Sequence, residues 1–100
     1  MEYFTNYEKL RLIEAEESDC QIILDLIHGI AKYEKMTDQV TATVESLYDS
    51  LFVKQRAKVI LAYENDALIG YMLYFFNYST FTGGANIYLE DLFIYFVQYL

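Results

Sequence analysis

Two adjacent carboxylates, Glu90 and Asp91, are the residues of this sequence whose types and spacing best suit chemistry. They stand within residues 88–94, an apolar and aromatic stretch that predicts a buried strand. Neighbouring side chains on a strand point to opposite faces, so at most one of the two points into a given cleft. A carboxylate pairs well with an ammonium group. Taken alone, the pair fits a role in solubility or capping better than a role in ligand binding.

The charge distribution favours a cationic ligand over an anionic one. The 100 residues carry a formal net charge of -8, and all seven Lys and Arg residues lie at or before Lys58. An anion held by residues 59–100 would depend on backbone N–H groups. Phosphate neutralisation by nucleic-acid binders needs clustered Lys and Arg, so we expect no nucleic-acid partner.

Cysteine content and hydropathy predict a soluble, cytoplasmic protein. Cys20 is the only cysteine and His28 the only histidine, which excludes an intramolecular disulfide and argues against a metal site. The amino terminus lacks the basic and apolar segments of a signal peptide. The longest apolar run, residues 67–76, is too short to span a bilayer. We therefore expect neither a metal nor a membrane partner.

Apolar periodicity predicts a strand followed by two helices in the first half of the chain. Residues 10–14 are short and apolar enough for a strand. Ser18, with Gln21 three residues on, has the form of a capping box and predicts the start of a helix. This helix has an apolar stripe that must pack on another element, formed by Ile22, Ile23, Leu26, Ile27 and Ile30. Thr43 is expected to cap a second helix with the apolar residues Val44, Leu47, Leu51 and Phe52.

The second half of the chain predicts three antiparallel strands. Residues 59–63, 67–78 and 85–99 are rich in β-branched and aromatic side chains, and turns are expected at residues 64–66 and 82–84. The order β-α-α-β-β-β describes an α+β fold in which two helices cover one face of an antiparallel sheet. No repeat or linker-like segment interrupts it, so residues 1–100 form a single domain.

Four segments resemble the amino-terminal half of a Gcn5-related N-acetyltransferase of the diamine (spermidine/spermine) type. They are residues 30–36, 39–40, 70–75 and 88–94. In that family the first segment ends the first helix, the third carries a near-invariant glycine, and the last is the central strand that lines the active site. The resemblance implies a partial acyl-CoA N-acyltransferase fold over residues 10–94. It leaves residues 1–9 as an N-terminal extension.

The resemblance also implies a reaction, the direct transfer of an acetyl group from acetyl-CoA to a small amine. Glu34, Glu90 and Asp91 match positions that hold the cationic substrate in diamine acetyltransferases. The backbone of Leu92, Phe93 and Ile94 matches the strand segment that meets the acetyl and pantetheine groups. In the family this contact uses main-chain donors where neighbouring strands splay, often at a β-bulge.

Residues 95–100 depart from the family pattern. The family continues into a glycine-rich loop that opens a helix and binds the pyrophosphate of acetyl-CoA through backbone N–H groups. Here no glycine and no arginine follow Ile94, and the later tyrosine that serves relatives as general acid is absent. We therefore expect a truncated domain that is catalytically inactive. The resemblance does not extend to acetyl-CoA binding by this chain.

The alternative hypothesis is a noncatalytic α+β module that self-associates. Residues 92–100 contain one polar side chain, Gln98, and would present a long aromatic sheet edge. Isolated proteins usually protect such an edge. We therefore expect a homodimer or strand-exchanged oligomer formed through residues 92–100. Coenzyme A binding separates the two hypotheses, because only a transferase needs it.

Overall fold

The structure is a computed structural model that describes residues 1–3 and 5–94. Its order of elements confirms the predicted α+β class. The predicted strand residues beyond Ile94, with most of the predicted self-association segment, lie outside the described residues. The elements are β1 (Glu2–Tyr3), β2 (Leu10–Glu14), η1 (Glu17–Asp19), α1 (Cys20–Tyr33), η2 (Thr37–Gln39), α2 (Val44–Tyr48), η3 (Asp49–Val53), β3 (Lys58–Glu64), β4 (Ala67–Ser79) and β5 (Gly84–Ile94).

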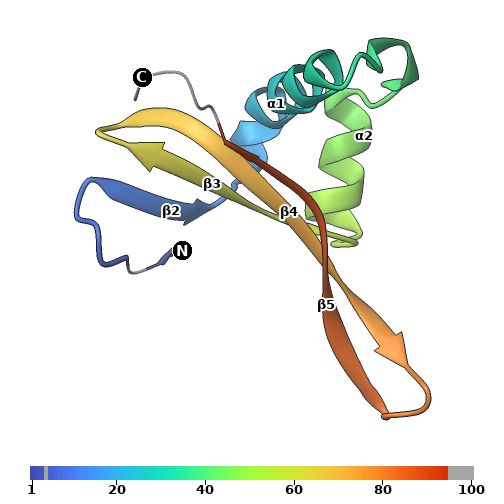
Figure 1. Cartoon of the computed structure of the whole chain (residues 1–100). Helices are drawn as coiled ribbons and strands as arrows, with labels where there is room; N and C mark the ends of the chain where they lie inside the picture. The colour runs from blue at the N-terminus through green and yellow to red at the C-terminus, as the bar shows by residue number, and fades with distance from the viewer. Residues whose placement is uncertain (4, 95–100) are drawn as a thin grey trace.

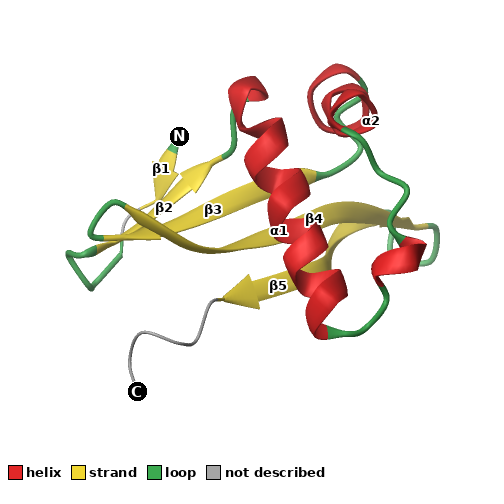
Figure 2. Ribbon diagram, turned by 90° about the horizontal axis from the view of Figure 1, so that it is seen from above, coloured by secondary structure: helices red, strands yellow, loops and turns green. Residues whose placement is uncertain are grey.

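The strands form one antiparallel sheet in the order β1-β2-β3-β4-β5. Both helices pack on the same face of this sheet, and α1 crosses its strands obliquely (Figures 1 and 2). The far ends of β4 and β5 project beyond the helices as a hairpin arm (Figure 1). The short strand β1, which the sequence pattern did not predict, lies within the expected N-terminal extension and pairs Tyr3 with Leu12.

The two helices begin differently, one as predicted and one not. Thr43 caps α2: its hydroxyl accepts from the Ser46 N–H at 3.0 Å, and Ser46 Oγ accepts from the Thr43 N–H at 2.9 Å. The prediction that Ser18 caps the first helix is wrong. Ser18 lies inside the 3-10 turn η1, and Asp19 Oδ2 accepts from the Glu16 N–H at 2.8 Å. Glu16 therefore occupies the N-cap position expected of Ser18, and Asp19 occupies the third position of the capping box, which was expected of Gln21.

The core lies between the helices and the central strands. Its buried members come from both halves of the chain and are Cys20, Ile23, Leu26, Leu47, Leu51, Val59, Leu61 and Tyr71. The predicted helical stripes thus reach the sheet. The pKa of the Cys20 thiol is raised, chiefly by burial and further by the neighbouring charge of Asp19. Cys20 is therefore a packing residue in the reduced, protonated form.

The turns that connect the strands use left-handed backbone where the sequence permits it. Asn65 and Asp66 have φ values of 49° and 66° and join β3 to β4. Gly83, with φ of 68°, lies in the turn between β4 and β5, and its N–H donates to the Ser79 carbonyl at 2.9 Å. Asn, Asp and Gly adopt this conformation at the lowest cost. Both predicted turns are confirmed.

Candidate functional site

Asp91 lies on the face of the sheet that carries the helices. The β4–β5 register pairs it with Leu73 and pairs Phe93 with Tyr71, and both Leu73 and Phe93 pack against the core. The Tyr71 hydroxyl donates to Asp91 Oδ2 at 2.9 Å. Asp91 is half-buried, whereas Tyr71 is only 2% exposed. The strand thus holds one carboxylate at the boundary between the core and solvent, and a buried tyrosine supports it.

Glu90 is separated from Asp91 by a β-bulge. Leu73 pairs with Asp91 while the next residue, Tyr74, pairs with Leu89, so Glu90 has no partner on β4. Glu90 is exposed. That the two carboxylates point to opposite faces stays a prediction, because the bulge interrupts the alternation of side chains at this point. The structure does not bring Glu90 into the Asp91 site. The bulge lies just before residues 92–94, the segment that the resemblance assigns to the acetyl group.

Glu34 follows α1 and reaches the same side of the sheet as Asp91. Its backbone N–H donates to the Ile30 carbonyl at 3.0 Å, and Lys35 then leaves the helix with φ of 58°. The Glu34 side chain is exposed, yet its charge acts on the buried Tyr71 hydroxyl. Of the three predicted substrate carboxylates, Asp91 contacts the Tyr71 hydroxyl, and the charge of Glu34 acts on the same hydroxyl without a contact that the structure shows.

The electrostatics of this cluster keep Tyr71 protonated. Burial raises the pKa of the Tyr71 phenol far above its ordinary value of 10, and the charge of Asp91, its hydrogen bond and the charge of Glu34 raise it further. Among residues 1–3 and 5–94, ion pairs join Arg11 to Glu2 and Asp66, and Lys54 to Asp49. None of these pairs involves Glu34, Glu90 or Asp91. No cationic side chain therefore neutralises these carboxylates within the described structure.

The segment that the resemblance assigns to acetyl-CoA lies at an edge of the described sheet. β5 is the last strand of the described sheet, so the segment that contains Leu92 and Ile94 runs along its edge beside Asp91. The resemblance assigns this segment to the acetyl and pantetheine groups. A pyrophosphate would need a helix N-terminus or basic side chains. No helix follows β5 in the described part of the chain, and no Lys or Arg follows Lys58.

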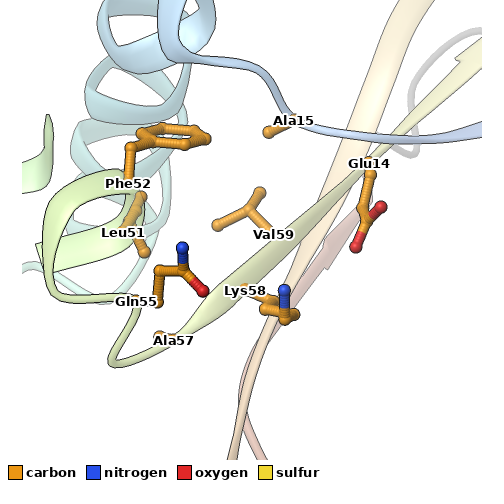
Figure 3. Close-up of a pocket in the computed structure, with 8 residues that line it drawn as sticks. All are labelled: Glu14, Ala15, Leu51, Phe52, Gln55, Ala57, Lys58 and Val59. Carbon is orange, nitrogen blue, oxygen red and sulfur yellow. The ribbon is translucent and has the colours of Figure 1, made fainter. Parts of the chain in front are cut away.

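A separate pocket of about 220 Å³ lies where β2 ends, β3 begins and η3 ends (Figure 3). It contains none of the predicted site residues. Its lining is Glu14, Ala15, Leu51, Phe52, Gln55, Ala57, Lys58 and Val59. Leu51 and Val59 belong to the core, and Glu14 and Lys58 do not form an ion pair with each other in the described structure. The pocket therefore does not coincide with the candidate site. The cluster around Tyr71 is chosen as the candidate site because of its carboxylates and not because of a cavity.

The side chains of the described residues offer no group of three or more His, Cys, Asp or Glu that could hold a metal ion. Within the same residues, neither helix has the length and apolar character needed to cross a membrane. Tyr71 is the site residue that sequence reasoning missed. Its strand had been recognised, but only the β4–β5 register shows that this tyrosine, one of eleven, reaches Asp91.

The chain is similar in sequence to known acetyltransferases. No protein-family model matches the chain. In sequence it is 40% identical over 90 residues to thialysine N-epsilon-acetyltransferase of Sus scrofa and 38% identical over 93 residues to that of Mus musculus. These alignments cover 81% and 84% of this chain and 52% and 54% of the relatives. The chain thus spans about half the length of these curated relatives.

A more distant relative is spermidine/spermine N(1)-acetyltransferase-like protein 1 of Homo sapiens. It is 30% identical over 98 residues, covering 90% of this chain and 14% of the relative. Among solved structures, an aminoglycoside acetyltransferase from a soil metagenomic sample superposes with a TM-score of 0.70 at 17% identity, over 88% of this chain and 57% of that chain. A possible acetyltransferase from Clostridium difficile gives 0.65 at 15% identity, over 90% and 59%. These likenesses establish the fold.

Proposed function

Because the chain has the partial fold of a Gcn5-related N-acetyltransferase and is related in sequence to amine acetyltransferases, we propose that it provides the amine-binding part of an acetyl transfer site. The substrate class is a small amine of the diamine or polyamine type. The observation that carries the proposal is the carboxylate of Asp91, which accepts from the buried Tyr71 hydroxyl at 2.9 Å, while the charge of Glu34 acts on the same hydroxyl. We also place the protein in the cytoplasm, whose reducing conditions suit its single buried Cys20.

Asp91 and Glu34 bind the cationic groups of the amine. An ammonium donates charge-assisted hydrogen bonds to carboxylate oxygens, and two carboxylates from different elements orient a substrate that carries more than one ammonium. An amine must lose a proton before its nitrogen attacks, and either carboxylate accepts this proton through water. Acetyl-CoA, when bound, supplies the acetyl group as a thioester. The backbone of Leu92, Phe93 and Ile94 lies next to Asp91 on β5, where that group would have to approach.

We propose that the described residues hold the amine and leave the pyrophosphate of acetyl-CoA without a binding group. Residues 95–100 contain no glycine or arginine for the pyrophosphate, and the general acid has no assigned residue in this chain. Glu90 is proposed as an outer carboxylate that attracts cations without touching the bound amine, because it is exposed and lies at the bulge.

Calorimetric titration with spermidine tests this proposal. We expect saturable binding that weakens as salt rises, because exposed and half-buried ionic contacts are screened. N-acetylspermidine, which has one cationic group fewer, should bind more weakly, and coenzyme A should give no binding heat. The reverse pattern, micromolar coenzyme A binding with no response to spermidine, would contradict the assignment of the site to the amine.

Self-association is a second candidate function, favoured by an apolar sheet edge. Leu92 is 61% exposed and Ile94 is 56% exposed, and these two residues lie opposite Met72 and Gly70 of β4. The rest of the predicted contact segment, residues 95–100, lies outside the described residues. Leu92→Lys should convert an oligomer to a monomer in analytical sedimentation, because it places a charge in the apolar contact. A variant that sediments as the wild type does would exclude this contact.

A further inference from the structure

Tyr71 combines a buried ring with a hydroxyl that ends at a partly exposed carboxylate. Its side chain is among the largest that are fully buried, and it packs in the core with Ile23, Leu26 and Leu61. A buried hydroxyl without a partner is costly. Asp91 Oδ2 is the partner that the structure gives it, at 2.9 Å. The contact therefore fixes two side chains at once, because the tyrosine ring cannot move without disturbing the core.

The β4–β5 register explains why a tyrosine is needed for this contact. Tyr71 lies directly opposite Phe93, and Asp91 precedes Phe93 by two residues. Tyr71 and Asp91 are thus diagonal neighbours on one face of the sheet. Such neighbours are separated by about 7–8 Å, a distance that aromatic and other long side chains span. The bulge at Glu90 changes the pairing immediately before Asp91.

The hydroxyl also orients Asp91 without neutralising it. A Lys or Arg in the same place would form an ion pair and compete with a cationic ligand, whereas a phenol donates a hydrogen bond and leaves the negative charge in place. Burial and the two carboxylates raise the pKa of this phenol, so the hydroxyl stays protonated and acts as a donor.

We propose that Tyr71 is the positioning residue of the amine site: its hydroxyl holds Asp91 Oδ2, so that the remaining lone pairs of this carboxylate face an ammonium on the Glu34 side of the sheet. The inference rests on the proposed function for its ligand. The hydrogen bond itself stands on the geometry of β4 and β5.

The Tyr71→Phe variant tests the proposal by removing only the hydroxyl. In the wild type, three-bond NMR couplings should report one χ1 rotamer for Asp91, and in the variant they should average over several. The affinity for spermidine should fall about tenfold. Tyr63→Phe is the matched control, because Tyr63 also packs against the core and its hydroxyl makes no hydrogen bond shown in the described structure. In Tyr63→Phe, the three-bond couplings at Asp91 and the affinity for spermidine should equal those of the wild type.

A double-mutant comparison separates positioning from general stability. If Tyr71 acts through Asp91, the double variant Tyr71→Phe/Asp91→Asn should bind spermidine less than twofold more weakly than Asp91→Asn alone. Independent, multiplicative losses would overturn the proposal. A wild-type Asp91 that already averages its rotamers would also overturn it, without the use of any variant. A wild type that binds no amine but shows one Asp91 rotamer, lost in Tyr71→Phe, would overturn the proposed function and support the positioning role.

Discussion

Replacing Asp91 with Asn should weaken spermidine binding by about tenfold to a hundredfold. The change removes the charge but keeps the shape and an oxygen that accepts from the Tyr71 hydroxyl. Hydrogen bonds to charged groups contribute about 1.5–3 kcal/mol, and each 1.4 kcal/mol corresponds to a factor of about ten in affinity. The fold should persist, because the buried hydroxyl keeps its partner. Calorimetric titrations of both proteins at the same ionic strength give the ratio.

Glu90→Gln is the matched control for this measurement. It removes the same unit of charge from the adjacent residue, but Glu90 is exposed and lies at the bulge away from Tyr71. Its effect should stay within about twofold, since exposed ionic contacts contribute little. Equal losses in the two variants would mean that the amine responds to the net charge of -8 and not to a site at Asp91.

Replacing Gly70 with Ala should cause the largest loss of stability among the single substitutions considered. An added Cβ would overlap the carbonyl oxygen of Phe93 and lie 2.9 Å from Ile94 Cα. These are backbone atoms of β5, so no flexible side chain can move away. Overpacking of this kind costs about 1–3 kcal/mol, and we expect the upper part of that range in urea unfolding. Because β5 carries Asp91, spermidine binding should weaken as well.

Gly84→Ala is the control for the loss of a glycine. A Cβ at Gly84 meets no atom within 4 Å, and Gly84 is not among the residues with positive φ. Its free energy of unfolding should change by less than about 0.5 kcal/mol. A Gly70→Ala variant as stable as Gly84→Ala would show that β4 and β5 are not packed as closely as described.

Much of the fold could be predicted from the sequence because its local signals agree with one another. The stripe that contains Ile23 and Leu26 faces the core, and Thr43 caps its helix as expected. The turn at Asn65 and Asp66 uses residues that tolerate positive φ. Each of these features depends on residues only a few positions apart in the chain. The local sequence pattern is therefore sufficient to predict them.

The site was predicted only in part, because its geometry depends on long-range pairing. Asp91 and Glu34 were recognised as candidates, but the partner of Asp91 is a tyrosine 20 positions earlier in the chain. Selecting that tyrosine requires the strand register, and the bulge at Glu90 shifts the register where it matters. The Ser18 cap failed for a local reason, because the first turn begins at the Glu16 N-cap and Ser18 therefore lies inside it.

NMR mapping of spermidine binding on the wild-type chain tests the central claim most directly. The proposed site predicts saturable shifts at Glu34, Tyr71 and Asp91, with no response at Glu14 and Lys58, which line the separate pocket. Shifts that gather at that pocket, that spread evenly over the acidic surface, or that do not occur at all would contradict an amine site at Asp91.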